Sequence, residues 1–145
     1  MQYSTEIRYE KTFPGKFNKL ANLSEFIAKA AARAGFDELE IYELQLAVDE
    51  AFSNIIEHAY GGEDAGDIDC MCFDNENNFT ITLHDWGKTF DPSSVPEPDF
   101  DVPLDKMNSR GAGLILIRKI MDETNFRFTE KDGNFLTMVK HKKSE

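Results

Sequence analysis

The sequence is poor in cysteine and in basic residues, and it contains no long hydrophobic run. Its only two cysteines, Cys70 and Cys72, stand two residues apart in an alternating stretch. Residues of like parity share one face of a strand, so we expect both to be small core residues. A disulfide or half of a metal site fits less well, because a metal motif needs further Cys or His ligands at set spacing.

The absence of a long apolar run also bears on location. No stretch approaches the length of a membrane span, and residues 1–11 lack the apolar segment of a secretory signal. We therefore expect a cytoplasmic protein that does not bind membranes. With 16 Lys and Arg against 27 Asp and Glu, the net charge is −11. No basic stripe is present to neutralise phosphates, so we expect no nucleic acid as a partner.

The length of 145 residues predicts one domain that buries its core without disulfides or structural metals. One segment of that domain, from Lys88 to Arg110, differs from the rest. It holds four of the five prolines and five acidic residues, and it has no lasting apolar period. A loop this long in a compact domain is usually a functional lid or disordered. We interpret residues 88–110 as a lid.

Apolar periodicity and turn residues predict the elements on both sides of this segment. Before it we expect a strand, two helices and two strands, at residues 5–13, 17–34, 37–60, 67–74 and 79–85. After it we expect a helix and two strands, at residues 114–122, 126–129 and 135–140. This order predicts an α/β fold of the two-layer sandwich type, with a mixed, mostly antiparallel sheet and helices on one face.

The second predicted helix carries a row of polar residues. Glu50, Asn54 and His58 recur at four-residue intervals, so they line one face of the helix beside an apolar stripe. Taken alone, this row is as consistent with a solvated helix face as with a binding site. For His58, packing near the helix terminus is the simpler interpretation.

Two glycine-containing stretches later in the chain favour a site. Asp85 ends a predicted strand just before Gly87, and a carboxylate there can accept a hydrogen bond from an exocyclic amine such as that of adenine. The alternative is an Asp that only begins a turn. Gly111 and Gly113 precede an apolar helix, where free amides and the helix dipole favour a phosphate. Glycines before helices are common, so this stretch is also weak by itself.

In this order, the three stretches resemble the motifs of the Bergerat-fold (GHKL, histidine kinase-like) ATPases. Residues 50–54 resemble the N box, residues 85–87 the first glycine box and residues 111–113 the second. More narrowly, the chain is similar to the stand-alone anti-sigma factor serine/threonine-protein kinases of bacteria, the RsbW and SpoIIAB type. The resemblance covers nearly the whole chain and implies a single histidine kinase-like ATPase domain over residues 1–145.

This resemblance implies ATP and magnesium as cofactors. Phosphoryl transfer needs magnesium and hydrogen-bond donors around the phosphates, and a base aimed at the attacking hydroxyl. By resemblance, Glu50 is the catalytic base and Arg110 reaches the terminal phosphate. Asn54 offers a neutral oxygen to magnesium.

The remaining motif residues are implied to bind the nucleotide. Asp85 fixes adenine, and Gly87 allows the ring close to the backbone. Gly111 and Gly113 donate amides to the phosphates. In the family a threonine on the last long strand supports the adenine contact through water, and Thr137 is the candidate in this chain.

The implied function is phosphorylation of a serine or threonine on a small, STAS-like anti-sigma factor antagonist. A sigma factor is a second candidate partner, and a homodimer is a candidate assembly. The alternative is a nucleotide-sensing module that sequesters a partner without phosphoryl transfer. The presence of both Glu50 and Asn54 favours the kinase, because a sequestering protein needs no base.

Overall fold

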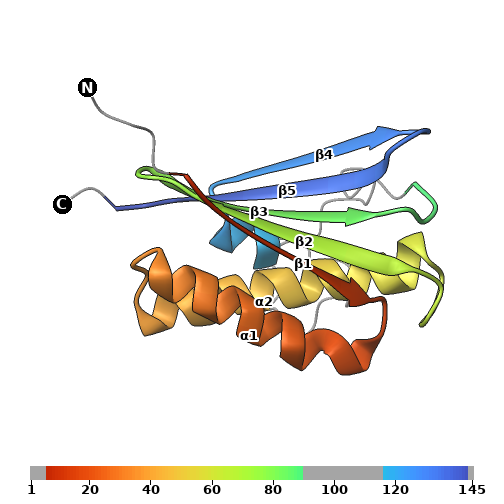
Figure 1. Ribbon diagram of the computed structural model, residues 1–145, viewed down its shortest axis with the longest axis horizontal. Coiled ribbons are helices and arrows are strands. Elements are labelled where there is room, and N and C mark those ends of the chain that lie inside the picture. Colours follow the sequence, from red (N-terminus) through yellow and green to blue (C-terminus); the bar gives the residue numbers. More distant parts are fainter. Residues whose placement is uncertain (1–5, 90–115, 144–145) are drawn as a thin grey trace, which may run out of the picture.

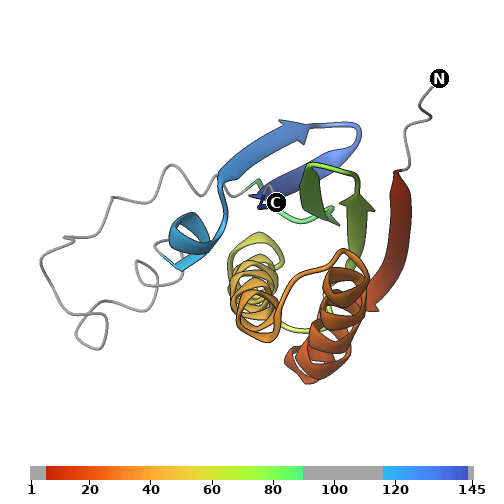
Figure 2. The same cartoon turned by 90° about the vertical axis from the view of Figure 1, so that its left-hand side faces the viewer.

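The computed structural model describes residues 6–89 and 116–143. In this part of the chain, a five-stranded sheet carries helices on one of its faces (Figures 1 and 2). The elements in chain order are β1 (Ile7–Pro14), η1 (Phe17–Lys19), α1 (Leu20–Arg33), α2 (Glu38–Asn54), η2 (Ile55–Ala59), β2 (Asp67–Asp74), β3 (Asn78–Asp85), β4 (Glu123–Thr129) and β5 (Gly133–His141). Residues 116–120 are also helical. Over the two described ranges, no helix combines the length and apolar character needed to cross a membrane.

The sheet has the strand order β1-β2-β3-β5-β4, and its four pairings are all antiparallel. The expected two-layer α/β sandwich is confirmed, and over the described strands the expected mixed sheet is narrowed to an antiparallel one. The last strand, β5, lies beside the central strand β3. In their register Asp85 pairs with Asn134, and Thr82 pairs with Thr137.

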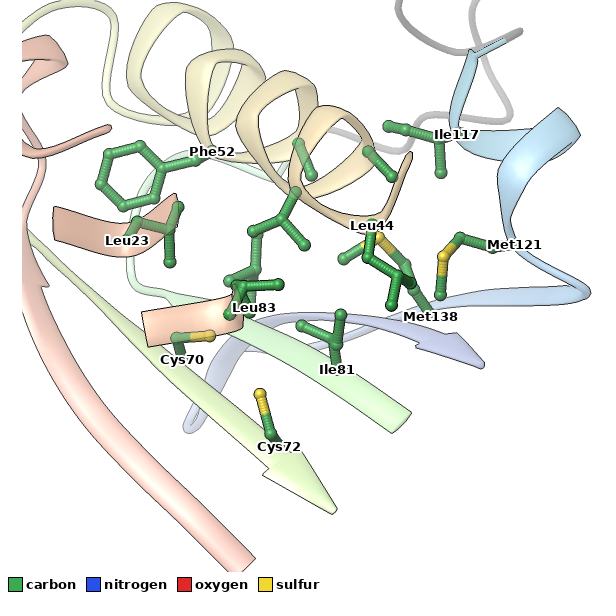
Figure 3. Packing of buried hydrophobic residues seen from close by; sticks show 14 of the residues in the cluster. Leu23, Leu44, Phe52, Cys70, Cys72, Ile81, Leu83, Ile117, Met121 and Met138 are labelled. Atoms are coloured by element: carbon green, nitrogen blue, oxygen red, sulfur yellow. The ribbon is translucent and has the colours of Figure 1, made fainter. Parts of the chain in front are cut away.

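The core fills the space between α1, α2 and the inner face of the sheet (Figure 3). Leu23 of α1 and Phe52 of α2 are fully buried there with Leu83 of β3. Cys70 and Cys72 of β2 lie in the same core as free thiols, as their alternation predicts. Because side chains alternate along a strand, Asp85 shares the inner face with Leu83.

The start and end of α2 are set by local chemistry. Asp37 caps it, because the Asp37 carboxylate accepts from the Glu40 amide (2.8 Å) and the Glu40 carboxylate accepts from the Asp37 amide (3.1 Å). Such a cap is worth about 1 kcal/mol. After Asn54 the helix widens into a π-turn, in which the Tyr60 amide donates to the Ile55 carbonyl (2.9 Å). Single π-turns often occur at functional sites.

Candidate functional site

A backbone contact joins the end of the second helix to the segment after β3. The Lys88 amide donates to the Ala59 carbonyl (2.7 Å). A Cβ added at Gly87 would lie 2.6 Å from the same carbonyl oxygen, so only glycine permits this approach. The helix that carries Glu50 and Asn54 is thereby fixed beside the end of the strand that carries Asp85.

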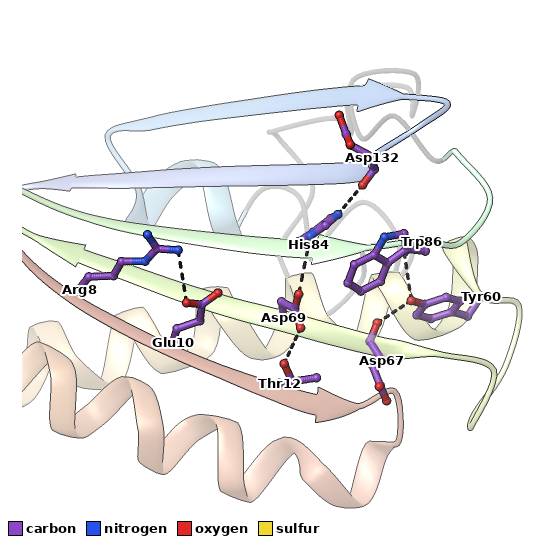
Figure 4. A network of polar contacts seen from close by, with 9 residues as sticks. All are labelled: Arg8, Glu10, Thr12, Tyr60, Asp67, Asp69, His84, Trp86 and Asp132. Atoms are coloured by element: carbon purple, nitrogen blue, oxygen red, sulfur yellow. Dashed lines mark hydrogen bonds and ion pairs between the residues drawn. The ribbon is translucent and has the colours of Figure 1, made fainter.

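Tyr60 reinforces this junction (Figure 4). Its hydroxyl donates to the Asp67 carbonyl (2.5 Å) and accepts from the Trp86 amide (3.1 Å). The ring lies so close to Gly66 that a Cβ there would be 2.6 Å from a ring carbon. Tyr60 therefore ties the end of the helix to the start of β2 and to the residue after Asp85. The Trp86 side chain is half exposed, and its ring lies against His84 with the centroids 4.1 Å apart.

Asp85 is a fixed hydrogen-bond acceptor. Only 3% of its surface is exposed, and its Oδ1 accepts from the Gly87 amide (2.9 Å) and from the Asn134 Nδ2 (2.8 Å). Burial raises the pKa of Asp85, and these two hydrogen bonds oppose that rise. A buried carboxylate held in one orientation suits the recognition of an exocyclic amine.

Asn134 is a site residue that sequence reasoning missed. It lies on β5 opposite Asp85 and is 2% exposed. Its Nδ2 also faces the carbonyls of Gly87 (3.1 Å) and Lys88 (3.4 Å). Within the described part of the chain, the Asn134 Oδ1 is buried without a hydrogen-bond partner. An unsatisfied buried acceptor costs about 1–3 kcal/mol, so the contacts of Nδ2 stabilise this orientation against that cost.

Thr137, the residue of the last strand expected to support the adenine contact, does not lie opposite Asp85, and its role stays a prediction. Thr137 pairs with Thr82, and their hydroxyl oxygens are 3.3 Å apart. Residues 134 and 137 differ by three positions, so their side chains lie on opposite faces of β5. Asn134, and not Thr137, is the β5 residue that reaches Asp85.

Glu50 and Asn54 lie in α2 as expected, both partly exposed. Burial raises the pKa of Glu50, and the negative charge of Glu57 raises it further. The sequence pattern assigned no role to Glu57. Its Oε2 also lies 3.8 Å from the Nε2 of His58, which is largely buried. The carboxylate of Glu50 is therefore shifted toward accepting a proton.

A second acidic side chain lies next to Glu50. Burial and the charge of Glu50 raise the pKa of Asp49 to about 6. The Asp49 Oδ1 is buried without a hydrogen-bond partner among the described residues. No feature of the sequence pattern distinguishes Asp49 from other polar positions of α2.

Three of the expected site residues, Arg110, Gly111 and Gly113, lie outside the described residues, as does the expected lid beyond residue 89. Their roles remain predictions. The described part of the site therefore consists of the α2 row, the end of β3 and the start of β5.

Comparisons with known proteins identify the family to which this fold belongs. The family model of the histidine kinase-like ATPase domain matches residues 13–140. Proteins named serine-protein kinase RsbW from Bacillus cereus (strain AH820) and Bacillus anthracis are each 32% identical over 138 residues, which cover 92% of this chain and 84% of theirs. A relative of the same name from Bacillus thuringiensis is 30% identical over the same shares.

A solved structure of the RsbU and RsbW domains of Rv1364c from Mycobacterium tuberculosis has the same fold. It matches 92% of this chain with a TM-score of 0.63 and 17% sequence identity. This chain covers 32% of that longer chain. At this identity the likeness concerns the fold alone.

Proposed function

The chain belongs to the histidine kinase-like ATPase family, and on this premise we propose that it is an ATP-dependent serine/threonine-protein kinase of the anti-sigma factor type. It transfers the terminal phosphoryl group of ATP to a hydroxyl on a small, STAS-like anti-sigma factor antagonist in the cytoplasm. Phosphorylation of the antagonist switches the kinase toward a sigma factor. The names of the RsbW relatives support the serine specificity.

The observation that carries the proposal is the backbone contact between Ala59 and Lys88. It links the end of the helix that carries Glu50 and Asn54 to the segment that follows Asp85. This link supports the proposal that the three side chains serve one nucleotide. Phosphoryl transfer depends mainly on positioning and charge stabilisation, so a shared frame for these side chains is what the reaction requires.

Each described residue has a role in this proposal. Asp85 accepts a hydrogen bond from the amino group of adenine. The Asn54 side-chain oxygen suits magnesium, which takes few protein ligands and completes its shell with phosphates and water. Magnesium, when bound, neutralises charge on the phosphates. Glu50 takes the proton of the attacking hydroxyl. The hydroxyl oxygen bonds to the terminal phosphorus, and ADP leaves.

The proposal also includes residues outside the described ranges. Gly111 and Gly113 donate backbone amides to the phosphates, and Arg110 contacts the terminal phosphate. Amides at the start of a helix suit this task because the helix dipole favours negative charge there.

A transfer experiment tests the proposal. The purified chain is given magnesium, ATP labelled at the terminal phosphate, and an antagonist-like protein from a neighbouring gene. We expect label on a serine or threonine of that protein, and none when the acceptor hydroxyl is replaced by alanine. Free labelled phosphate alone would indicate an ATPase. Intact ATP with measurable binding would indicate a nucleotide-sensing module, and either result would overturn the kinase.

A further inference from the structure

Asn134 lies where three acceptor oxygens converge. Its Nδ2 donates to the Asp85 carboxylate at 2.8 Å and faces the carbonyl oxygens of Gly87 and Lys88 at 3.1 and 3.4 Å. Oxygens that only accept cannot bind one another, so a donor is needed between them. The Gly87 amide also donates to the same Asp85 oxygen (2.9 Å), but the Asn134 amide is the donor that faces all three oxygens. The reversed amide would place its own oxygen against all three.

We propose that Asn134 is a positioning residue, whose amide holds one oxygen of Asp85 together with the Gly87–Lys88 backbone and keeps that carboxylate an ionised acceptor for the amino group of a bound base. This inference rests on the proposed function, because it assigns the nucleotide base to Asp85. Asn134 acts through Asp85, and the proposal includes no direct contact between Asn134 and the nucleotide.

The chemistry of the amide explains why this side chain suits the position. An amide NH₂ supplies two hydrogens, so it can serve the carboxylate and the neighbouring carbonyls at once. A hydroxyl supplies one hydrogen, and an ionised carboxylate or an alkyl group supplies none. Among the described residues no donor reaches the Asn134 Oδ1, so only the donor half of this amide makes hydrogen bonds there.

The charge balance around Asp85 gives the proposal its readout. Burial raises the pKa of Asp85, whereas the Asn134 and Gly87 hydrogen bonds and the charge of His84 lower it. Among the described residues, Tyr60 is another titratable group near Asp85, and its pKa is raised by burial and by the charges of Asp85, Asp67 and Asp69. Loss of the Asn134 donor leaves burial less opposed, so Asp85 takes up a proton at a higher pH. A protonated Asp85 is a poorer acceptor, and affinity then falls as the pH falls.

The test compares three variants of the full chain by calorimetric titration with magnesium and a non-hydrolysable ATP analogue, from pH 5 to pH 9. Asn134→Leu removes both hydrogens, and we expect about 10- to 100-fold weaker binding at the acidic end, with a smaller loss at high pH. Asn134→Thr keeps one donor, and we expect an intermediate loss with the same sign of pH dependence.

For Asn134→Asp we expect the opposite dependence of binding affinity on pH. At high pH its carboxylate repels Asp85, and binding is weakest there. As the pH falls the two carboxylates share a proton, which restores a donor to Asp85 and recovers affinity. His84 and Tyr60 are present in every variant, so they cannot make affinity rise with pH in one variant and fall with pH in another.

The matched control is Asn125→Leu on the exposed surface of β4, which we expect to bind like the natural chain at every pH.

The proposal is supported if affinity falls with decreasing pH in Asn134→Leu and rises with decreasing pH in Asn134→Asp. Where Asn134→Leu fails to fold, as judged by circular dichroism, the opposite slopes of Asn134→Thr and Asn134→Asp decide. Equal losses at every pH would reduce Asn134 to a structural residue and overturn the inference, as would variants that bind like the natural chain. In both cases the natural chain still binds the analogue. Failure of the natural chain to bind it would overturn the proposed function as well.

Discussion

Two carboxylates at the site, Asp85 at the end of β3 and Glu50 within α2, have opposite surroundings. Burial raises the pKa of both. For Asp85, hydrogen bonds from Asn134 and from the Gly87 amide oppose that rise. For Glu50, the charge of Glu57 adds to it. Burial thus destabilises the charge on both carboxylates, but hydrogen bonds offset part of this effect at Asp85, whereas the charge of Glu57 adds to it at Glu50.

This difference separates two tasks. A carboxylate that must accept a hydrogen bond from a base works best when it stays ionised and fixed. A general base works best when its pKa approaches the operating pH, because it must be free to take a proton. The first description fits Asp85 and the second fits Glu50, so the variants below test one against the other.

The largest effect is expected from Glu50→Gln, which removes the proton acceptor and keeps the size of the side chain. We expect phosphoryl transfer to slow by about two to four powers of ten, the usual contribution of a general base. Nucleotide affinity should stay close to that of the natural chain. Single-turnover transfer and equilibrium binding measured together check both statements. Normal turnover in this variant would remove Glu50 from the mechanism.

Asp85→Asn should weaken nucleotide binding and leave the transfer rate at saturating ATP largely unchanged. It replaces a charged acceptor by a neutral one, and we expect about 10- to 100-fold weaker binding of ATP, the worth of a hydrogen bond to a charged group. The transfer rate at saturating ATP should change far less than in Glu50→Gln. Calorimetry and initial rates at several ATP concentrations separate the two. Unchanged affinity would show that Asp85 does not hold the base.

Gly87→Ala tests the frame that holds both carboxylates together. The added methyl group would lie 2.6 Å from the Ala59 carbonyl oxygen, so the backbone contact has to shift. We expect the free energy of unfolding to fall by about 1–3 kcal/mol, as for other overpacked sites. Thermal and urea denaturation measure the change. A variant as stable as the natural chain would show that the contact is dispensable.

Glu57→Gln is expected to have the smallest effect on the transfer rate, and it tests the link between Glu57 and Glu50 directly. Removing this negative charge lowers the pKa of Glu50, so Glu50 stays ionised to a lower pH. The acidic limb of the transfer rate should therefore move to lower pH while the plateau rate is retained. Glu76→Gln, in the exposed turn between β2 and β3, is the matched control. A limb that moves equally in both variants would contradict the link between Glu57 and Glu50.

Much of the fold is predictable because its patterns are local. The alternation in residues 67–74 gives the observed bounds of β2, and the Asp37–Glu40 pair gives the start of α2. The prediction fails most at β4, which begins at Glu123 instead of residue 126. Five of its seven residues are exposed, so this edge strand shows no burial alternation for a pattern to reveal.

The site is only partly predictable, for a different reason. Spacing along one helix places Glu50 and Asn54 on the same face without knowledge of the rest of the fold. The partner of Asp85 depends on the register between β3 and β5, which are distant in the sequence. A shift of three positions separates Asn134 from Thr137 and moves the side chain to the other face of the sheet. Glu57 lies in a π-turn, where the usual helical periodicity does not apply.

The most direct test of the account is a crystal structure of the chain with magnesium and a non-hydrolysable ATP analogue. The account predicts that the adenine amino group donates to Asp85, that the terminal phosphate lies beside Glu50, and that Asn54 contacts the magnesium ion. A nucleotide bound elsewhere, or one whose base lies on Asp85 while its phosphates point away from α2, would contradict the central claim that both carboxylates serve one nucleotide.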